Sequence, residues 1–338
     1  MDSLMQSVID MLPDNIAIVL CGSYISIMRE LLEEANPLFG RFTLIMHIEE
    51  FDYYDSSRFY EHLSVYDKVA FYSVLGGSPF VLENIDADSG LKENIISKLI
   101  PETGIYRTYI ENILLREIQK AYDVRILEAI GNGKKKYSEL DAMLSGKSSG
   151  LLDKQLKNLL AMETIKKTYP INKKNDKKKQ FYEISDNLMR FYFTYIFGNE
   201  GMIVNLGPKG FYERMIEPSI KTFISHRFEN ITLQFFRRQI MNGKMDYAMN
   251  YGSYWYDNPK TKSNGEFDCV VESKDSYDFY ECKYYEKPMS MEECMIEADQ
   301  VHNISGVSIG NIGFVCVNGF DFESKEWRLI TGEDMYCY

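Results

Sequence analysis

The stretch GEFDCVVESKDSYDFYECKYY, residues 265–285, contains two runs in which apolar and polar residues alternate, separated by the polar sequence SKDS. Alternation with a period of two, interrupted by a short polar segment, predicts a β-hairpin. Charged residues nevertheless occupy positions where a hairpin normally has neutral cross-strand pairs, namely Asp268, Glu281 and Lys283. This hairpin therefore decides the expected fold of the C-terminal region and is the first candidate for a functional site.

The length of the turn sets the register of the hairpin. If residues 273–276 form the turn, Glu272 faces Tyr277, and Asp268 then lies opposite Glu281. Opposed side chains have Cβ atoms about 5 Å apart, and like charges at that separation repel. Asp268 and Glu281 therefore need a partner that compensates their charge.

A divalent cation is one such partner. Magnesium is typically held by one or two carboxylates together with water and substrate phosphate, and it can generate a nucleophilic hydroxide. We therefore predict that Asp268 and Glu281 bind Mg²⁺. Lys283 is expected to orient the attacking water or to stabilise the developing negative charge.

The alternative is a purely structural hairpin. The same register places Glu266 opposite Lys283, and these two residues can form an ordinary cross-strand ion pair. Because side chains alternate across a strand, the charged residues are expected on one face, opposite Phe267, Cys269 and Val271. A register slip of one residue would exchange the two faces.

Length and composition limit the remaining possibilities. At 338 residues the chain exceeds what one core usually supports, which predicts two or three domains. No apolar run approaches the roughly 18 residues needed to cross a bilayer, and the N-terminus does not have the pattern of a signal peptide, so we expect a cytoplasmic protein. The six cysteines contain no C-x-x-C pair and the four histidines no metal-ligand spacing, which argues against a zinc site.

The first third of the chain reads as an α/β segment followed by helices. Two apolar runs, at 15–23 and 41–51, predict buried strands with a helix at 24–35 between them. Helical spacing then continues over 55–115 and is interrupted by the sequence GGSP. Two strands cannot bury both faces of a parallel sheet, so this segment is expected to be the end of a larger domain.

The middle of the chain has the order of a winged helix-turn-helix. Two strand-like runs around a lysine-rich tip follow three short amphipathic helices, predicted at 122–130, 137–144 and 150–161. The C-terminal region is expected to be α+β. It combines the hairpin with a strand at 311–320 and with helices at 186–199, 211–240 and 290–304.

Charge is distributed unevenly along the chain, whose formal net charge is -12. From Lys134 to Lys179 there are 13 lysines and 5 acidic residues, whereas residues 265–338 contain 5 basic and 16 acidic residues. Lysines clustered on a winged helix predict contacts to DNA phosphates. The alternative is a solvated loop or a protein-interaction module. The expected DNA-binding residues are Lys154, Lys157, Lys173, Lys174, Lys177, Lys178 and Lys179.

Several segments, in this order, resemble the archaeal-type ATPases, a prokaryotic AAA+/STAND-like family with an ATPase domain, a winged helix and a C-terminal domain of unknown function similar to PD-(D/E)XK nucleases. VLCGSYISIM resembles the family's sensor strand and following helix, NPLFGRFTLIMHIEEFDYYD its PLYGR segment, and VLGGSPFVLENID its GxP-like lid motif. FYEISDNLMRFYFTYIFGN resembles the junction after the wing, and GEFDCVV with YECKYY the nuclease-like hairpin.

The resemblance covers essentially the whole chain and implies four regions. These are a remnant of a P-loop-type ATPase α/β core at 1–50, a helical lid at 51–115, a winged helix at 116–188 and a restriction-endonuclease-like PD-(D/E)XK domain at 189–338. The family's P-loop and acidic metal-binding strand are expected ahead of Met1. The chain therefore looks like a truncated member, for which ATPase activity is not expected.

The resemblance also implies roles for individual residues. In an intact member, Gly77 and Pro79 would contact ATP, and Arg41 would sense a phosphate. Glu229 matches the helix glutamate that completes the nuclease site, and Gln300 lies where related nucleases have a glutamine.

The leading hypothesis is a DNA-binding protein with a magnesium-dependent DNA endonuclease site. One alternative is a non-catalytic regulatory or toxin-antitoxin-like interaction protein that acts through a protein partner or as an oligomer. Another is an ATP-binding switch whose P-loop is absent from this chain.

Overall fold

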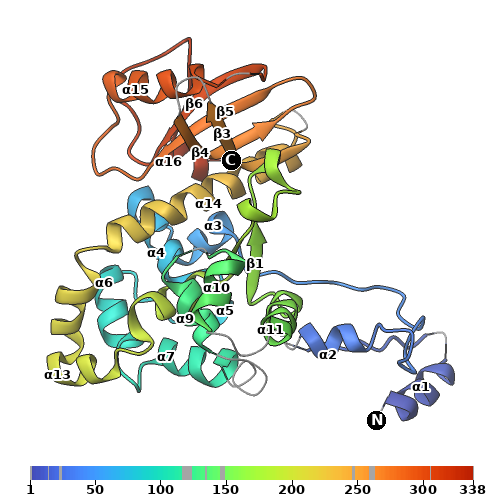
Figure 1. The fold of residues 1–338 in the computed structure, drawn as a ribbon. Helices are drawn as coiled ribbons and strands as arrows, with labels where there is room; N and C mark the ends of the chain where they lie inside the picture. The colour runs from blue at the N-terminus through green and yellow to red at the C-terminus, as the bar shows by residue number, and fades with distance from the viewer. Residues whose placement is uncertain are drawn as a thin grey trace.

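The computed structural model describes residues 2–13, 15–22, 25–115, 124–133, 135–144, 149–245, 248–258, 263–304 and 306–337. These residues form a mixed α/β structure with a body of helices, a five-stranded mixed sheet and a separate two-stranded sheet (Figure 1). The five-stranded sheet lies at one end of the helical body, and an N-terminal arm extends from the side (Figure 1). No helix in the described ranges is long and apolar enough to span a membrane.

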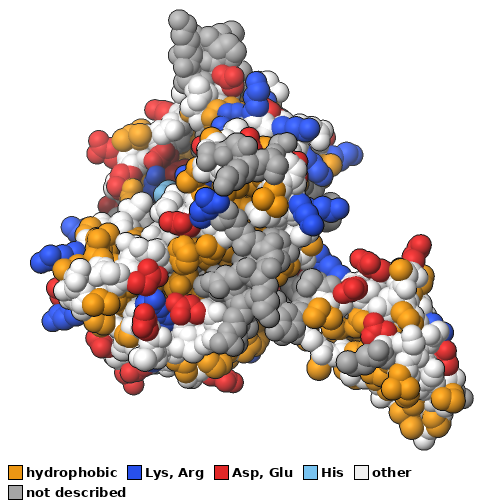
Figure 2. Space-filling model, turned by 60° about the horizontal axis from the view of Figure 1, so that its bottom comes forward, with side chains coloured by type: hydrophobic (Ala, Val, Ile, Leu, Met, Phe, Trp, Pro, Cys, Tyr) orange, Lys and Arg blue, Asp and Glu red, His pale blue; other side chains and the backbone are white. Residues whose placement is uncertain are grey.

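The N-terminal arm contains two short helices, α1 (Asp2–Asp10) and α2 (Ile25–Glu30). The strands predicted at 15–23 and 41–51 are wrong, because residues 15–22 and 41–51 form no strand. Their apolar side chains are largely exposed, with Val19 at 85% and Ile48 at 84%, and Figure 2 shows hydrophobic side chains gathered on this arm. A strand forms only where a neighbour satisfies its backbone groups, and both described sheets consist of other segments of the chain.

The helical body begins near residue 53 and confirms the predicted helical region. Gly76 follows α4 with a positive φ of 72°, and Pro79 is the first residue of α5, so the predicted break is present. Proline is favourable there because the first N–H of a helix has no partner within the helix. The elements, with short non-α helices labelled η, are α3 (Tyr53–Ser56), η1 (Ser57–Tyr60), α4 (Val65–Leu75), α5 (Pro79–Glu83), α6 (Gly90–Asn94), η2 (Ile95–Leu99), α7 (Ile105–Tyr109) and η3 (Ile110–Leu115).

The middle region also has the predicted order of elements. Its two strands, β1 (Ile165–Thr168) and β2 (Phe181–Ile184), pair antiparallel, and the connection between them contains η4 (Ile171–Lys173) and η5 (Lys177–Lys179). Three helices precede the strands, namely α9 (Arg125–Gly131), α10 (Tyr137–Met143) and α11 (Ser149–Ala161).

One long helix, α14 (Ile220–Met241), joins the helical body to the five-stranded sheet. Phe228 and Phe236 of α14 are buried, and the Phe236 ring lies 4.6 Å from the Tyr280 ring of the sheet. A cluster of buried side chains runs from Tyr53 to Met335 and includes both rings. Four shorter elements lead into this helix, namely α12 (Asn187–Phe191), η6 (Tyr192–Ile196), α13 (Glu200–Phe211) and η7 (Tyr212–Ile216).

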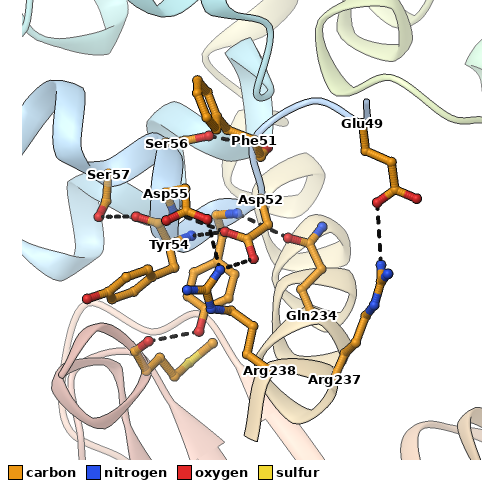
Figure 3. A network of polar contacts seen from close by, with 12 residues as sticks. Glu49, Phe51, Asp52, Tyr54, Asp55, Ser56, Ser57, Gln234, Arg237 and Arg238 are labelled. Atoms are coloured by element: carbon orange, nitrogen blue, oxygen red, sulfur yellow. Dashed lines mark hydrogen bonds and ion pairs between the residues drawn. The ribbon is translucent and has the colours of Figure 1, made fainter. Parts of the chain in front are cut away.

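Polar contacts hold α14 against the start of the helical body (Figure 3). Arg238 donates hydrogen bonds to Asp52 at 2.6 Å and to Asp55 at 2.9 Å, and its guanidinium lies 4.5 Å from the centroid of the Tyr54 ring. Asp52 also caps α3 by accepting the backbone N–H groups of Tyr54 and Asp55. One aspartate therefore both begins α3 and fixes the position of α14.

The five-stranded sheet has the order β3-β4-β5-β6-β7. The pairs from β3 to β5 are antiparallel, whereas β6 and β7 run parallel to β5. The sequence predicted the hairpin, α15 and β6 but missed β3 and β7. The elements are β3 (Asn250–Asn258), β4 (Ser263–Glu272), β5 (Tyr277–Lys283), α15 (Met291–His302), β6 (Ile309–Cys316), β7 (Arg328–Thr331) and α16 (Gly332–Tyr336).

The register of the hairpin is the predicted one, since β4 and β5 pair from Glu272 with Tyr277 to Cys269 with Tyr280. The packing of Phe267 differs from the prediction. A bulge between β3 and β4 shifts the register around Asp268, so that Phe267 packs in a cluster with Val270 instead of with Cys269. An extra residue in a bulge interrupts the alternation of side chains across a strand, and alternation was the basis of the predicted faces.

Candidate functional site

Lys283 is the centre of a charged cluster on one face of the five-stranded sheet. Its ammonium lies 2.7 Å from a carboxylate oxygen of Glu281 on the same strand and 2.9 Å from one of Glu297 on α15. All three side chains are about three-quarters buried, with exposed fractions of 21% for Lys283, 26% for Glu281 and 24% for Glu297. The sequence predicted the first two residues of this cluster but missed Glu297.

The cluster has more negative than positive charge. Burial raises the pKa of Glu281, and the carboxylates of Glu297 and Glu229 raise it further against the opposing effect of Lys283. Burial lowers the pKa of Lys283, but Glu281 and Glu297 outweigh it and raise that pKa above its ordinary value. Lys283 is therefore firmly protonated, and its single charge does not fully offset the carboxylates around it.

Asp268 and Glu229 form the other half of the candidate site, next to α14. The carboxylate of Glu229 lies 3.4 Å from the ring Nδ1 of His226, one turn away, and its backbone carbonyl accepts the thiol of Cys269 at 3.5 Å. The hydrogen bond that His226 donates to Glu229 raises the pKa of His226, burial opposes this rise, and the negative charge of Asp268 adds to it. Asp268 thus lies within electrostatic reach of α14, and Glu229 is close enough to influence Glu281 as well.

The donor chemistry of this region fits magnesium, which prefers carboxylate oxygens and needs only one or two of them when water and phosphate complete its coordination. Within the described ranges, no three His, Cys, Asp or Glu side chains are grouped so that they could hold a metal ion by themselves. Asp268 and Glu281, the predicted ligands, are therefore not part of a preformed three-ligand site. Gln300 joins the same cluster, since it donates to Glu297 at 2.8 Å.

The predicted DNA-binding lysines belong to two parts of the middle region, α11 and the connection between β1 and β2. Lys154 and Lys157 are exposed on α11. The rest belong to the connection between β1 and β2, where Lys173 and Lys179 are partly buried and the exposed members are Lys174, Lys177 and Lys178.

The connection between β1 and β2 is docked on β3, the edge strand of the five-stranded sheet. Asn172 donates to the backbone carbonyl of Trp255 at 2.7 Å and accepts its backbone N–H at 3.1 Å. The ammonium of Lys179 lies 2.9 Å from the centroid of the Trp255 ring, and Ile171 packs into the cluster that holds Phe267. The lysine-bearing tip is thus held beside the sheet that contains the acidic residues.

The residues expected to contact ATP have different neighbours. Arg41 binds Asp10 of α1 through two hydrogen bonds of 2.8 and 2.9 Å, on the N-terminal arm. Gly77 packs against the backbone of Phe51, so closely that a Cβ atom at this position would lie 1.8 Å from the Phe51 carbonyl oxygen. Pro79 begins α5. ATP binding stays a prediction from the family resemblance.

Sequence reasoning also missed a pair of carboxyl groups, Glu50 and Asp186, that face each other beside Gly76. A Cβ atom at Gly76 would lie 3.4 Å from an oxygen of Asp186 and 3.8 Å from one of Glu50. Burial raises the pKa of Glu50 to about 8, with the charge of Asp186 and a hydrogen bond to it adding to the effect. No local pattern could have predicted this pair, since 136 residues separate its members. Of the residues that sequence reasoning missed, only Glu297 had a local signal, because it lies three residues before Gln300 on one helix.

Comparisons with known proteins match part of the C-terminal region to a family of unknown function. Residues 192–296, which include α14 and β3 to β5, match the DUF234 family, described as archaeal and bacterial proteins of unknown function. An uncharacterized protein of Methanocaldococcus jannaschii is 28% identical over 262 residues, which cover 75% of this chain and 58% of that protein. No solved structure matches the chain. Membership of the ATPase family stays a prediction.

Proposed function

We propose that the C-terminal region is a magnesium-dependent DNA endonuclease domain of the PD-(D/E)XK type, and that α9, α10, α11, β1 and β2 form a winged helix that holds the DNA. The observation that carries the proposal is the register of β4 and β5. The paired residues end at Cys269 and Tyr280, and the next residue along each strand is Asp268 on β4 and Glu281 on β5. The excess of negative charge around Lys283 supports the same proposal, because a divalent cation would offset it.

The proposed roles follow from the neighbours of each residue. Asp268 and Glu281 would hold Mg²⁺, and Glu229 would accept a hydrogen bond from a metal-bound water. Bound Mg²⁺ would polarise a phosphate oxygen and lower the pKa of the attacking water. Lys283 would stabilise negative charge on the phosphate while Glu297 keeps its side chain in position.

The docked lysines explain how DNA could approach an acidic surface. The C-terminal region repels phosphates, since residues 265–338 contain 16 acidic and 5 basic residues. Lys174, Lys177 and Lys178 are exposed on a tip that is fastened to β3 by Asn172. Phosphates bound by these lysines would be held next to the sheet, which offsets the repulsion.

The test is cleavage of supercoiled plasmid in the presence of Mg²⁺ or of EDTA. We expect magnesium-dependent nicking that is lost in the isosteric variants Asp268→Asn and Glu281→Gln. Asp275→Asn, at an exposed position in the turn of the same hairpin, is the matched control and should cleave normally. Cleavage that survives the first two substitutions would reject the nuclease assignment.

DNA binding without cleavage is the second candidate, and one observation favours it. Lys283 is already held by two carboxylates, as in a structural ion pair. Fluorescence anisotropy with a labelled duplex tests the DNA binding that both candidates require, and the plasmid assay separates them. Neutralising Lys174, Lys177 and Lys178 together to Gln should weaken binding and flatten its salt dependence, whereas Lys325→Gln, at an exposed site on the sheet domain, should not. Binding that is insensitive to salt would reject both candidates.

A further inference from the structure

A polar cavity of about 280 Å³ lies between the end of α4, the residues that follow β2, and α14. Small-molecule sites in proteins are usually clefts of roughly 300 to 1,000 Å³, so this cavity has the size for a compact ligand. Its lining combines residues far apart in the sequence, from Glu50 to Tyr251. Neither the nuclease proposal nor the DNA-binding lysines use it.

One side of the cavity is cationic. Lys166 from β1 and Arg227 and Arg237 from α14 line it. Behind them, the buried carboxylate of Glu183 lies 3.1 Å from Lys166, 2.9 Å from Arg190 and 3.9 Å from Arg227. Burial tends to raise the pKa of Glu183, but these three cations lower it to about 2. A single carboxylate is thus shared by three positive groups.

The remaining carboxylates do not fully compensate these cations. Arg237 lies 3.6 Å from Glu49, in a pair that is more than half exposed. Burial raises the pKa of Asp186, and the backbone N–H of Met189 that it accepts at the start of α12 opposes this rise. The pKa of Glu50 is raised as well, so this pair of carboxyl groups carries less than its full negative charge at neutral pH. Lys166, Arg190 and Arg227 share the single carboxylate of Glu183, and the wall formed by Lys166 and Arg227 is therefore positive.

We propose that this cavity binds a small molecule that carries an oxyanion group, either a phosphate or a carboxylate. The oxyanion lies against Lys166 and Arg227, because a guanidinium presents paired N–H donors that match two oxygens of such a group. The amides of Asn187 and Gln234 and the Glu50 carboxyl line the rest of the cavity and can hydrogen-bond to hydroxyl or amino groups of the ligand. The limited volume favours a small molecule over a nucleic-acid strand.

Equilibrium dialysis of the full chain with radiolabelled inorganic phosphate, at pH 7 and constant ionic strength, tests this site. We expect saturable binding of one phosphate per chain with a dissociation constant in the millimolar range or below. Lys166→Gln should weaken binding at least about tenfold, the loss of one charge-assisted contact. Lys167→Gln, at the neighbouring exposed lysine that packs on Tyr182 instead, is the matched control and should bind as the natural chain does.

Competition identifies which oxyanion the site takes. Displacement of phosphate by acetate at equal concentration indicates a carboxylate ligand, and displacement only by phosphomonoesters such as glycerol phosphate indicates a phosphorylated one. Phosphate binding that shows no saturation up to about 10 mM phosphate would overturn the proposal. Equal weakening by Lys166→Gln and Lys167→Gln would do the same, because it would mean a diffuse charge effect. Neither result depends on whether the chain cleaves DNA.

Discussion

Substitution of Lys283 by Met tests whether the carboxylates around it repel one another. The change removes two charge-assisted hydrogen bonds, to Glu281 at 2.7 Å and to Glu297 at 2.9 Å, while most of the apolar stem is retained. Such bonds contribute about 1.5 to 3 kcal/mol each when buried, and partial exposure lowers their contribution. We therefore expect the free energy of unfolding at pH 7 to fall by about 2 to 3 kcal/mol, less than the sum of two fully buried bonds.

The loss should depend on pH with a definite sign. The pKa of Glu281 in the folded chain is above its ordinary value. Ionisation of Glu281 therefore lowers the stability of the fold as the pH rises past that ordinary value. Without Lys283 this loss of stability becomes larger, because the Lys283 charge no longer offsets the negative charges of Glu297 and Glu229. The difference between Lys283→Met and the natural chain should therefore be smaller near pH 4, where Glu281 is largely protonated, than at pH 7.

Urea denaturation followed by circular dichroism at both pH values measures the difference. Lys287→Met, at an exposed lysine four residues away, is the matched control and should change stability by less than about 0.5 kcal/mol. Added Mg²⁺ should restore part of the stability of Lys283→Met but not of Lys283→Met combined with Glu281→Gln. A loss that is equal at pH 4 and pH 7 would refute the argument from repulsion.

Three further substitutions test other parts of the structure. Gly77→Ala should destabilise the chain by about 3 kcal/mol or more, because its Cβ would lie 1.8 Å from the Phe51 carbonyl oxygen, whereas Gly150→Ala has free space and should be nearly neutral in a thermal melt. Phe236→Ala should cost about 3 to 5 kcal/mol in urea denaturation through the cavity it leaves, compared with less than about 1 kcal/mol for the exposed Phe59→Ala. The raised pKa of Glu50 makes the natural chain less stable as the pH rises toward about 8, by about 1 to 3 kcal/mol between pH 5 and pH 8. Glu50→Gln should abolish this pH-dependent loss of stability, and the control Glu49→Gln should keep it. Parallel stability curves for Glu50→Gln and the natural chain would contradict this reasoning.

Local sequence signals predicted the elements that depend on near neighbours. The four-residue turn sets the β4–β5 register because it joins strands that are adjacent in the chain. The sequence GGSP ends α4 and begins α5 because glycine accepts a positive φ at Gly76 and proline suits the first turn of a helix. The same local logic failed for the N-terminal arm. Apolar runs indicate a buried strand only if other strands are present to cover them.

The candidate site divides in the same way. The sequence alone determined the register in which Cys269 pairs with Tyr280, and that Lys283 follows Glu281 on the same strand, since a short turn fixes the pairing of the strands that it joins. Only the tertiary structure decided that Glu297 of α15 holds Lys283, that a bulge at Asp268 redirects Phe267, and that Glu50 meets Asp186 beside Gly76. These contacts join segments separated by many residues, and their formation depends on the packing of whole helices and strands, to which no local pattern of residues corresponds.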